Sequence, residues 1–193
     1  GVTFLIKKTY YSLLAAFLFL MSACSDKDEH NTPQKAQIDP NAPKTISLLQ
    51  MSGNELNITY APGLIPKFKH LDISSHKGKI LFLDFFKTDC QPCRDEIPHL
   101  VNLQDKYKDQ FQVIGINVGN EAITDLRSFS DYYHLNYPLV EAGQNYIMTD
   151  LVGGVRGVPA MFMYDEDGNY FTHYLGAVPQ AMIENDIKKL LGK

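Results

Sequence analysis

The positions of apolar residues along the chain predict a mixture of strands and helices. Continuous apolar runs of about four to eight residues are typical of strands buried on both faces of a sheet, whereas apolar residues repeated every three or four positions are typical of helices with one buried face. The chain contains both kinds of segment. The predicted buried strands span 79–86, 111–117 and 160–164, and the predicted helices span about 93–109, 125–134, 146–151 and 182–191.

Two turn signals predict hairpins at opposite ends of the domain. Ser52-Gly53-Asn54 separates apolar stretches at 46–49 and 56–58, and an acidic, glycine-containing turn separates 160–164 from a last strand at 170–175. The second connection is too short for a parallel crossover, so the last two strands should pair antiparallel. Strands that alternate with helices predict an α/β fold class, with a central mixed β-sheet flanked by helices and an N-terminal β-hairpin extension.

The first residues have the pattern of an export signal. Lys7 and Lys8 precede an apolar segment at 13–21, which is shorter than the ~20 apolar residues that a membrane-spanning helix needs. Leu20-Met21-Ser22-Ala23-Cys24 resembles the lipobox of bacterial lipoproteins, which implies cleavage before Cys24 and a lipid on its sulfur. Ordinary signal cleavage that leaves Cys24 free is the alternative. The expected organisation is a signal peptide at 1–23, a lipid-bearing flexible tether at 24–44 and one domain at 45–193.

Composition narrows the classes of function. Apolar residues make up 45% of the chain, which is enough for a sizeable core. The formal charge of −4 is spread over mixed signs, without the clustered basic face that nucleic-acid binding requires. Three cysteines are too few for a disulfide framework, so packing must stabilise the fold.

The most informative motif is Cys90-Gln91-Pro92-Cys93, directly after the apolar run at 79–86. A C-x-x-C pair beside a strand is typical of proteins that exchange a disulfide with other proteins. Cys90 is expected at a helix N-terminus, where free N–H groups and the helix dipole stabilise a thiolate, and Cys93 would attack back to release a mixed disulfide. Half of a zinc site is the alternative. Zinc needs four ligands, and the chain has neither a second C-x-x-C nor an H-x-x-H pair, so no metal is expected.

Two acidic residues are candidates for the proton transfers. Asp84 interrupts the apolar run before Cys90. It either points to an exposed face or is buried near Cys93, where desolvation would raise its pKa and let it accept the Cys93 proton. Glu96 follows Cys93 by about one helical turn on the same side. Since Arg94 and Asp95 lie beside it, Glu96 could equally be a solvated helical glutamate.

Two stretches resemble one known family. The sequence from Phe85 to Pro98 resembles the active-site motif of the TlpA/ResA/CcmG branch of membrane-tethered thioredoxin-like proteins, and Val155-Arg156-Gly157-Val158-Pro159 resembles its cis-proline loop. The resemblance covers about 45–191 and implies a thioredoxin-like fold. It implies that Cys90 is the exposed nucleophile, that Cys93 resolves, and that the two form the redox disulfide. It also implies a cis peptide before Pro159, with Val158 pairing to the substrate chain, and we expect Gln91 and Pro92 to contact substrate beside them.

The resemblance does not decide which acid accepts the proton. The chain also departs from the family at two aromatic positions. Glu96 matches the acidic residue near the active site of ResA-like members, and Asp84 matches the buried aspartate of thioredoxin. Phe86 and Asp89 stand where the family has tryptophan. Asp89 places a negative charge beside the Cys90 thiolate, which disfavours ionisation, and Lys87 and Arg94 offset part of this effect. A less stabilised thiolate favours the disulfide form, so the expected potential is closer to that of thioredoxin than to that of DsbA.

These features predict an exported, membrane-tethered thiol–disulfide oxidoreductase without a cofactor. The resemblance implies reduction of protein disulfides, for example in apocytochrome c, and re-reduction by a DsbD/CcdA-like membrane thiol carrier. The protein is expected to be a monomer in the bacterial cell envelope, lipid-anchored to the membrane, with its domain on the periplasmic or extracytoplasmic side. The alternatives are a general thiol oxidant or isomerase, a copper chaperone that uses Cys90 and Cys93, and an inactive structural lipoprotein.

Overall fold

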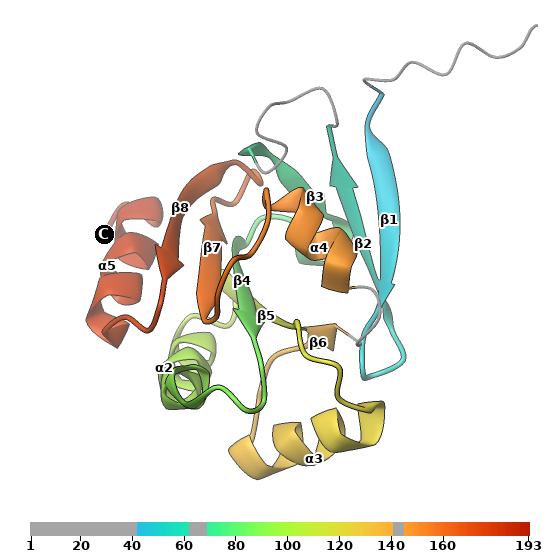
Figure 1. Cartoon of the computed structure of the whole chain (residues 1–193). Helices are drawn as coiled ribbons and strands as arrows, with labels where there is room; N and C mark the ends of the chain where they lie inside the picture. The colour runs from blue at the N-terminus through green and yellow to red at the C-terminus, as the bar shows by residue number, and fades with distance from the viewer. Residues whose placement is uncertain (1–41, 62–68, 141–144) are drawn as a thin grey trace, which may run out of the picture. The chain divides into compact units, whose positions relative to one another are not determined.

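The computed structural model of the chain describes residues 42–61, 69–140 and 145–193 (Figure 1). The predicted signal peptide at 1–23, Cys24 and the tether up to residue 41 lie outside the described residues. The last residue of the predicted tether, Lys44, is the first residue of strand β1 (Lys44–Leu49). Among the described residues, no helix combines the length and the apolar character needed to span a membrane.

A five-stranded sheet forms the centre of the domain, in the order β6-β5-β4-β7-β8 (Figure 1). Its strands are β4 (Ile80–Phe86), β5 (Phe111–Asn117), β6 (Leu139–Val140), β7 (Ala160–Tyr164) and β8 (Tyr170–Leu175). β4 pairs parallel with β5 and antiparallel with β7, and β7 pairs antiparallel with β8. The sheet is therefore mixed, as predicted, and its central strand leads directly into the cysteine pair.

Helices and a second sheet cover the two faces of the central sheet. The even-numbered apolar residues of β4 pack with helices α2 (Gln91–Lys106), α3 (Ile123–Tyr133) and α5 (Gln180–Leu190). The odd-numbered residues of β4 pack with α4 (Asn145–Leu151) and with the second sheet. Because successive side chains of a strand point to opposite faces, Asp84 shares the α2 face with Phe82 and Phe86.

The predicted N-terminal hairpin is confirmed, and it belongs to a three-stranded sheet. β1 pairs antiparallel with β2 (Glu55–Tyr60), and β2 pairs antiparallel with β3 (Leu71–Ile73), which the 3-10 helix η2 (Ser74–His76) follows. Buried leucine and isoleucine side chains of this sheet join the core on the α4 face. The sequence pattern does not predict β3 or β6, because strands of three and two residues are too short to show a period.

Element boundaries agree with the predicted ones to within a few residues. The strands at 111–117, 160–164 and 170–175 are confirmed, and β4 begins one residue later than predicted. Helix α2 begins at Gln91 rather than at 93, because Cys90 is its N-cap and Pro92 lies in the first turn, where a missing N–H costs no hydrogen bond. It ends at Lys106 rather than near 109, and it continues through Pro98.

Candidate active site

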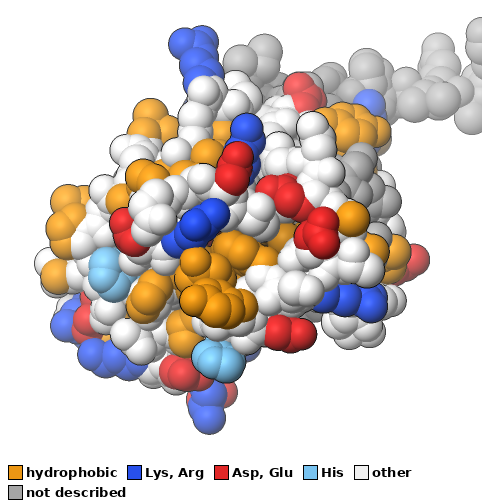
Figure 2. Space-filling model, turned by 60° about the horizontal axis from the view of Figure 1, so that its bottom comes forward, with side chains coloured by type: hydrophobic (Ala, Val, Ile, Leu, Met, Phe, Trp, Pro, Cys, Tyr) orange, Lys and Arg blue, Asp and Glu red, His pale blue; other side chains and the backbone are white. Residues whose placement is uncertain are grey.

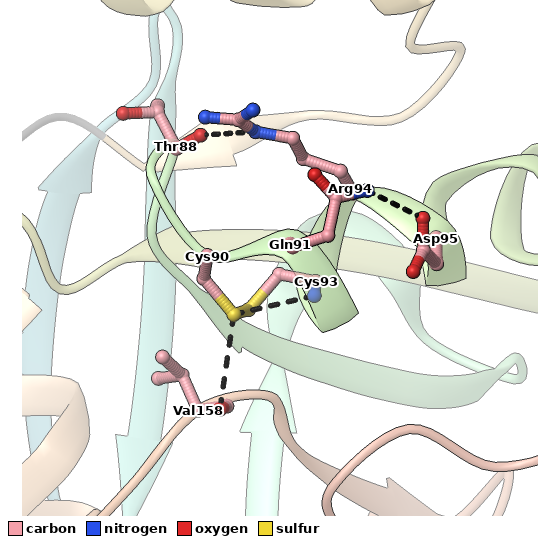
Figure 3. Close-up of a disulfide and its surroundings, with 7 residues drawn as sticks. All are labelled: Thr88, Cys90, Gln91, Cys93, Arg94, Asp95 and Val158. Atoms are coloured by element: carbon pink, nitrogen blue, oxygen red, sulfur yellow. Dashed lines mark hydrogen bonds between the residues drawn. A yellow bond between two sulfur atoms is a disulfide. The ribbon is translucent and has the colours of Figure 1, made fainter.

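The two cysteines form a disulfide at the point where β4 gives way to α2 (Figure 3). Their Cα atoms are 5.3 Å apart. Cys93 is 3% exposed and belongs to the core on the α2 face, whereas Cys90 is partly exposed at the helix start. The pair is therefore asymmetric: solvent and another protein can reach the sulfur of Cys90, while that of Cys93 is enclosed.

The helix start favours a negative charge on Cys90. The backbone N–H of Cys93 donates to Cys90 Sγ at 3.2 Å, and the first turn of α2 contains no acidic residue. Free N–H groups and the dipole of a 16-residue helix attract an anion at this position. When the disulfide is reduced, Cys90 is thus the sulfur more readily present as thiolate, which is the attacking species.

The Val158–Pro159 loop lies against Cys90. The peptide bond between the two residues is cis, and the carbonyl oxygen of Val158 lies 3.8 Å from Cys90 Sγ (Figure 3). Pro159 is buried, and its own carbonyl accepts the N–H of Gly176 at 2.8 Å, which ties the loop to the end of β8. The loop is thereby held beside the reachable sulfur.

A groove of about 650 Å³ runs along this loop. It is lined by residues 152–160 together with Phe162, His173, Leu175 and Gly176. The face turned forward in Figure 2 carries apolar side chains near its centre, with acidic, basic and histidine side chains around them. Gln91 and Pro92 are exposed at the helix start, and Gln91 Nε2 donates to Asp95 Oδ1 at 2.8 Å.

Both candidate acids are buried behind Cys93. Asp84 is 4% exposed and Glu96 is 2% exposed, so Glu96 is not a solvated surface residue, and Asp84 does not point to an exposed face. Glu96 Oε2 accepts the backbone N–H of Val178 at 3.1 Å. Asp84 Oδ1 and Glu96 Oε1 have no hydrogen-bond partner among the described residues. Each acid therefore keeps one buried oxygen free to take a proton.

Burial makes both acids weak. Desolvation, with a smaller contribution from the charge of Glu96, raises the pKa of Asp84 from 3.8 to about 7. Desolvation also raises the pKa of Glu96, which the hydrogen bond from Val178 partly offsets. Two carboxylates in one buried site repel each other when both are ionised. The pair therefore keeps a proton up to near-neutral pH.

Tyr137 is a third buried group at this site, and the sequence pattern does not predict it. It is 7% exposed, and desolvation followed by the charges of Asp84 and Glu96 raises its pKa well above the ordinary value. Its ring packs over Gly115, the residue that pairs with Asp84 across β4 and β5. A Cβ at Gly115 would lie 3.4 Å from Tyr137 Cε2 and 2.3 Å from the Leu139 side chain. The glycine inside an apolar run was the available signal of such a close approach.

The described residues do not assemble a metal centre. No group of three or more His, Cys, Asp and Glu side chains among them is placed to hold a metal ion.

Comparison with known proteins places the chain in a family. Residues 61–170, more than half of its length, match the AhpC/TSA family. The chain belongs to the AhpC/TSA family. Its thioredoxin-like fold and its C-x-x-C pair at the helix start are consistent with that membership.

Thiol-disulfide oxidoreductases named ResA are similar to the chain over more than half of its length. It is 31% identical over 124 residues to the thiol-disulfide oxidoreductase ResA of Bacillus thuringiensis, covering 63% of this chain and 69% of that protein. It is 28% identical over 118 residues to ResA of Bacillus subtilis, covering 61% and 64%. A solved thiol:disulfide interchange protein of the thioredoxin family from Chlorobium tepidum superposes with a TM-score of 0.58 at 26% identity, covering 79% and 96%. The protein is thus a thiol–disulfide oxidoreductase similar to ResA.

The structure brings the predicted site residues of the domain to one place. Cys90 and Val158 are partly exposed and lie side by side, Pro159 is buried next to Val158, and Cys93, Asp84 and Glu96 are buried. Cys24 lies outside the described residues. The individual roles of these residues remain predictions, and they enter the proposal below.

Proposed function

We propose that the protein is an exported, lipid-anchored reductant of disulfides in client proteins. The observation that carries the proposal is the asymmetric cysteine pair, with Cys90 reachable at a helix N-terminus and Cys93 buried beside two weak acids. An oxidoreductase needs one sulfur that meets the client and one that the client cannot reach. The similarity to proteins named ResA supports the same activity.

The reaction starts from the dithiol form. The Cys90 thiolate attacks one sulfur of a client disulfide, so that a Cys90–client bond forms and the client's other sulfur leaves as a thiolate. Cys93 then loses its proton and attacks Cys90 Sγ, which forms the Cys90–Cys93 bond seen in the structure and releases the second client thiolate. Two electrons pass from the protein to the client, and no cofactor is needed.

Asp84 and Glu96 serve the second step as a pair. Cys93 is a weak attacking group until its proton leaves, and Asp84 and Glu96 are buried carboxyl groups whose raised pKa values suit a proton acceptor better than that of the buried Tyr137. Asp84 has a pKa of about 7, which suits a group that accepts a proton near neutral pH. Because each acid alters the ionisation of the other, the proton belongs to the pair rather than to one residue.

The client docks along the Val158–Pro159 loop. An extended client segment can pair with the backbone of Val158 and so present its sulfur to Cys90, with neighbouring side chains in the groove beside the loop. Gln91 and Pro92 are exposed at the helix start and complete the docking surface. By resemblance, apocytochrome c before haem attachment is a suitable client, since its cysteines must be reduced.

The cellular setting of the proposal comes from the sequence outside the described residues. A signal peptide at 1–23 would export the protein, and lipid on Cys24 would hold the domain at the outer side of a membrane in the cell envelope. Such a compartment lacks the cytosolic thiol pool. A DsbD/CcdA-like membrane carrier would therefore supply electrons to the monomeric domain.

Trapping of mixed disulfides tests the proposal. In a Cys93→Ala variant the second step is blocked, so clients should accumulate on Cys90 as adducts that a reductant releases. The matched control carries both Cys90→Ala and Cys93→Ala and should capture nothing. Absence of adducts on the Cys93→Ala variant would contradict the proposed activity.

The redox state of the pair in cells decides the direction of electron flow. Rapid acid quenching followed by thiol labelling should find mostly the dithiol form for a reductant. Mostly disulfide would favour the general oxidant or isomerase instead. Tight, stoichiometric Cu(I) binding by the reduced domain together with no disulfide exchange would favour the copper chaperone.

A further inference from the structure

The turn before Cys90 is held from two sides by polar contacts centred on Thr88. The hydroxyl of Thr88 donates to Glu121 Oε1. Figure 3 shows the second contact, in which the carbonyl oxygen of Thr88 accepts Arg94 Nε at 2.7 Å. The N–H of Cys90 donates to the carbonyl of Lys87 at 3.3 Å and closes the turn. Since Thr88 lies two residues before Cys90, its position fixes the position of Cys90, the N-cap of α2.

Glu121 is anchored to the central sheet. Its second carboxylate oxygen, Oε2, accepts Asn117 Nδ2 at 2.9 Å. Asn117 is fully buried at the end of β5, where its Oδ1 accepts the N–H of Gly119 at 2.6 Å and its carbonyl accepts the side chain of Asn145. The contact from Glu121 to Thr88 therefore joins the cysteine turn to the rigid end of a central strand.

Apolar packing holds this turn only weakly, which makes the polar contacts decisive. Lys87 and Asp89, on either side of Thr88, are both exposed. Thr88 itself is half-buried and uses its hydroxyl and its carbonyl oxygen in the two contacts. A turn whose neighbours contribute little burial depends on its hydrogen bonds for a single conformation.

Glu121 also carries a charge. Burial alone would raise its pKa, but hydrogen bonds from the side chain and backbone of Thr88, from its own backbone and from Asn117 outweigh burial and lower it. The carboxylate is therefore ionised at neutral pH. Among the described residues no lysine, arginine or histidine forms a salt bridge with it. The cations of the turn are Lys87, which is exposed, and Arg94, whose Nε donates to the carbonyl of Thr88, so they reduce the effect of the Glu121 charge without pairing with it.

We propose that Glu121 is a positioning residue for Cys90 that also makes the protein more reducing. Through Thr88 it holds Cys90 at the helix N-cap, and through its charge it opposes the Cys90 thiolate. Opposition to the thiolate favours the disulfide form, which is the product of client reduction. The inference deepens the proposed function and rests on it, since both concern the reactivity of Cys90.

Three variants separate the two effects. Glu121→Gln keeps an acceptor for the Thr88 hydroxyl and removes the charge. Thr88→Val removes the hydroxyl and keeps the charge of Glu121. Glu166→Gln, at an exposed position in the turn between β7 and β8, is the control. The first measurement is the pH midpoint of iodoacetamide alkylation at Cys90 in the reduced full-length protein. The second is the equilibrium constant with glutathione, and the third is the single-turnover rate of reduction of a disulfide peptide.

Removal of the Glu121 charge should shift the equilibrium with glutathione, whereas removal of the Thr88 hydroxyl should lower the single-turnover rate. Glu121→Gln should lower the alkylation midpoint and make the equilibrium with glutathione about two- to five-fold less reducing. Thr88→Val should slow the single turnover about ten-fold while its equilibrium constant moves less than that of Glu121→Gln. Equal midpoints and equilibrium constants for wild type, Glu121→Gln and Glu166→Gln would overturn the role of the charge. A wild-type rate in Thr88→Val would overturn the positioning role.

These outcomes are independent of the proposed function. If the wild-type protein reduces no client at all, the proposed function fails, but alkylation of Cys90 still reports whether Glu121 controls its ionisation. If clients are trapped normally and the Glu121→Gln midpoint is unchanged, the inference about Glu121 fails alone.

Discussion

The raised pKa of the buried acid Asp84 predicts how the free energy of unfolding depends on pH. Its pKa is about 7 in the folded protein against an ordinary value of 3.8, a difference of about three units. One unit corresponds to about 1.4 kcal/mol, so the folded state loses about 4 kcal/mol relative to the unfolded state as this group ionises. Because the pKa of Asp84 is higher in the folded state, its contribution to the free energy of unfolding is fully present below pH 3.8. This contribution is lost progressively as the pH rises from 3.8 to about 7. Above that pH the loss is constant.

The variant Asp84→Asn tests this linkage. The amide has nearly the shape of the carboxyl group but does not ionise, so the variant should lack most of the decline in stability between pH 4 and pH 8. Urea unfolding of the oxidised proteins at several pH values gives the free energy of unfolding for each. Asp109→Asn, at an exposed position, is the matched control and should follow the wild-type curve. If Asp84→Asn and wild type decline in parallel, Asp84 is not the raised group.

The same variant tests the proposed proton transfer. Loss of a general base typically slows a reaction about 10²–10⁴-fold, and the remaining acid, Glu96, should keep the loss near the lower limit. Stopped-flow reduction of a disulfide peptide separates the two chemical steps. We expect release of the mixed disulfide to slow about 10²-fold, while the first attack by Cys90 changes little. Unchanged release would contradict a role for Asp84 in deprotonating Cys93.

Four further predictions concern the acid pair, the packing at Gly115, the lipid on Cys24 and the redox potential. Glu96→Gln should lower the apparent pKa of Asp84, read from the pH dependence of stability, because it removes a like charge; an unchanged profile would exclude coupling between the acids. Gly115→Ala should destabilise the fold by about 1–3 kcal/mol in urea unfolding, because its Cβ would lie 2.3 Å from Leu139; equal stability would mean that this side chain moves aside. Cys24→Ser should abolish radiolabelled palmitate incorporation, and labelling that persists would locate the lipid elsewhere. The potential measured against glutathione should lie nearer about −270 mV, as in thioredoxin, than about −120 mV, as in DsbA, and a value at the DsbA end would contradict the expected direction.

The sequence predicts the framework well because its signals are local and strong. The runs at 111–117 and 160–164 are continuous and lie between turn residues, and both strands have these bounds. The C-x-x-C motif predicts the helix start for the same reason, since Pro92 favours a first turn. Strands β3 and β6 are missed because they depend on pairing with neighbours far away in the sequence rather than on their own residues.

The inner part of the site is harder to predict. Asp84 stands out as an acid in an apolar run, but nothing local shows that Glu96 is buried, since its helix neighbours Arg94 and Asp95 are polar. The hydrogen bond of its side chain comes from far away in the sequence, from the backbone N–H of Val178, more than eighty residues later. Tyr137 and Glu121 join the site through similar long-range contacts: Gly115 inside its apolar run signals a close approach, but nothing local shows that Tyr137 makes it or that Glu121 accepts the Thr88 hydroxyl.

The negative charges around the cysteines support one direction of electron flow. In the proposal, Asp89 and Glu121 oppose the Cys90 thiolate, Lys87 and Arg94 of the same turn act in the opposite direction, and an ionised carboxylate of the buried acid pair opposes the second thiolate. The helix N-terminus acts the other way and keeps Cys90 reactive enough to attack. A dithiol that is poorly stabilised as thiolate gains more when it becomes a disulfide. An arrangement that keeps Cys90 able to start the exchange while it favours the oxidised product is what the proposed reductant of client disulfides requires.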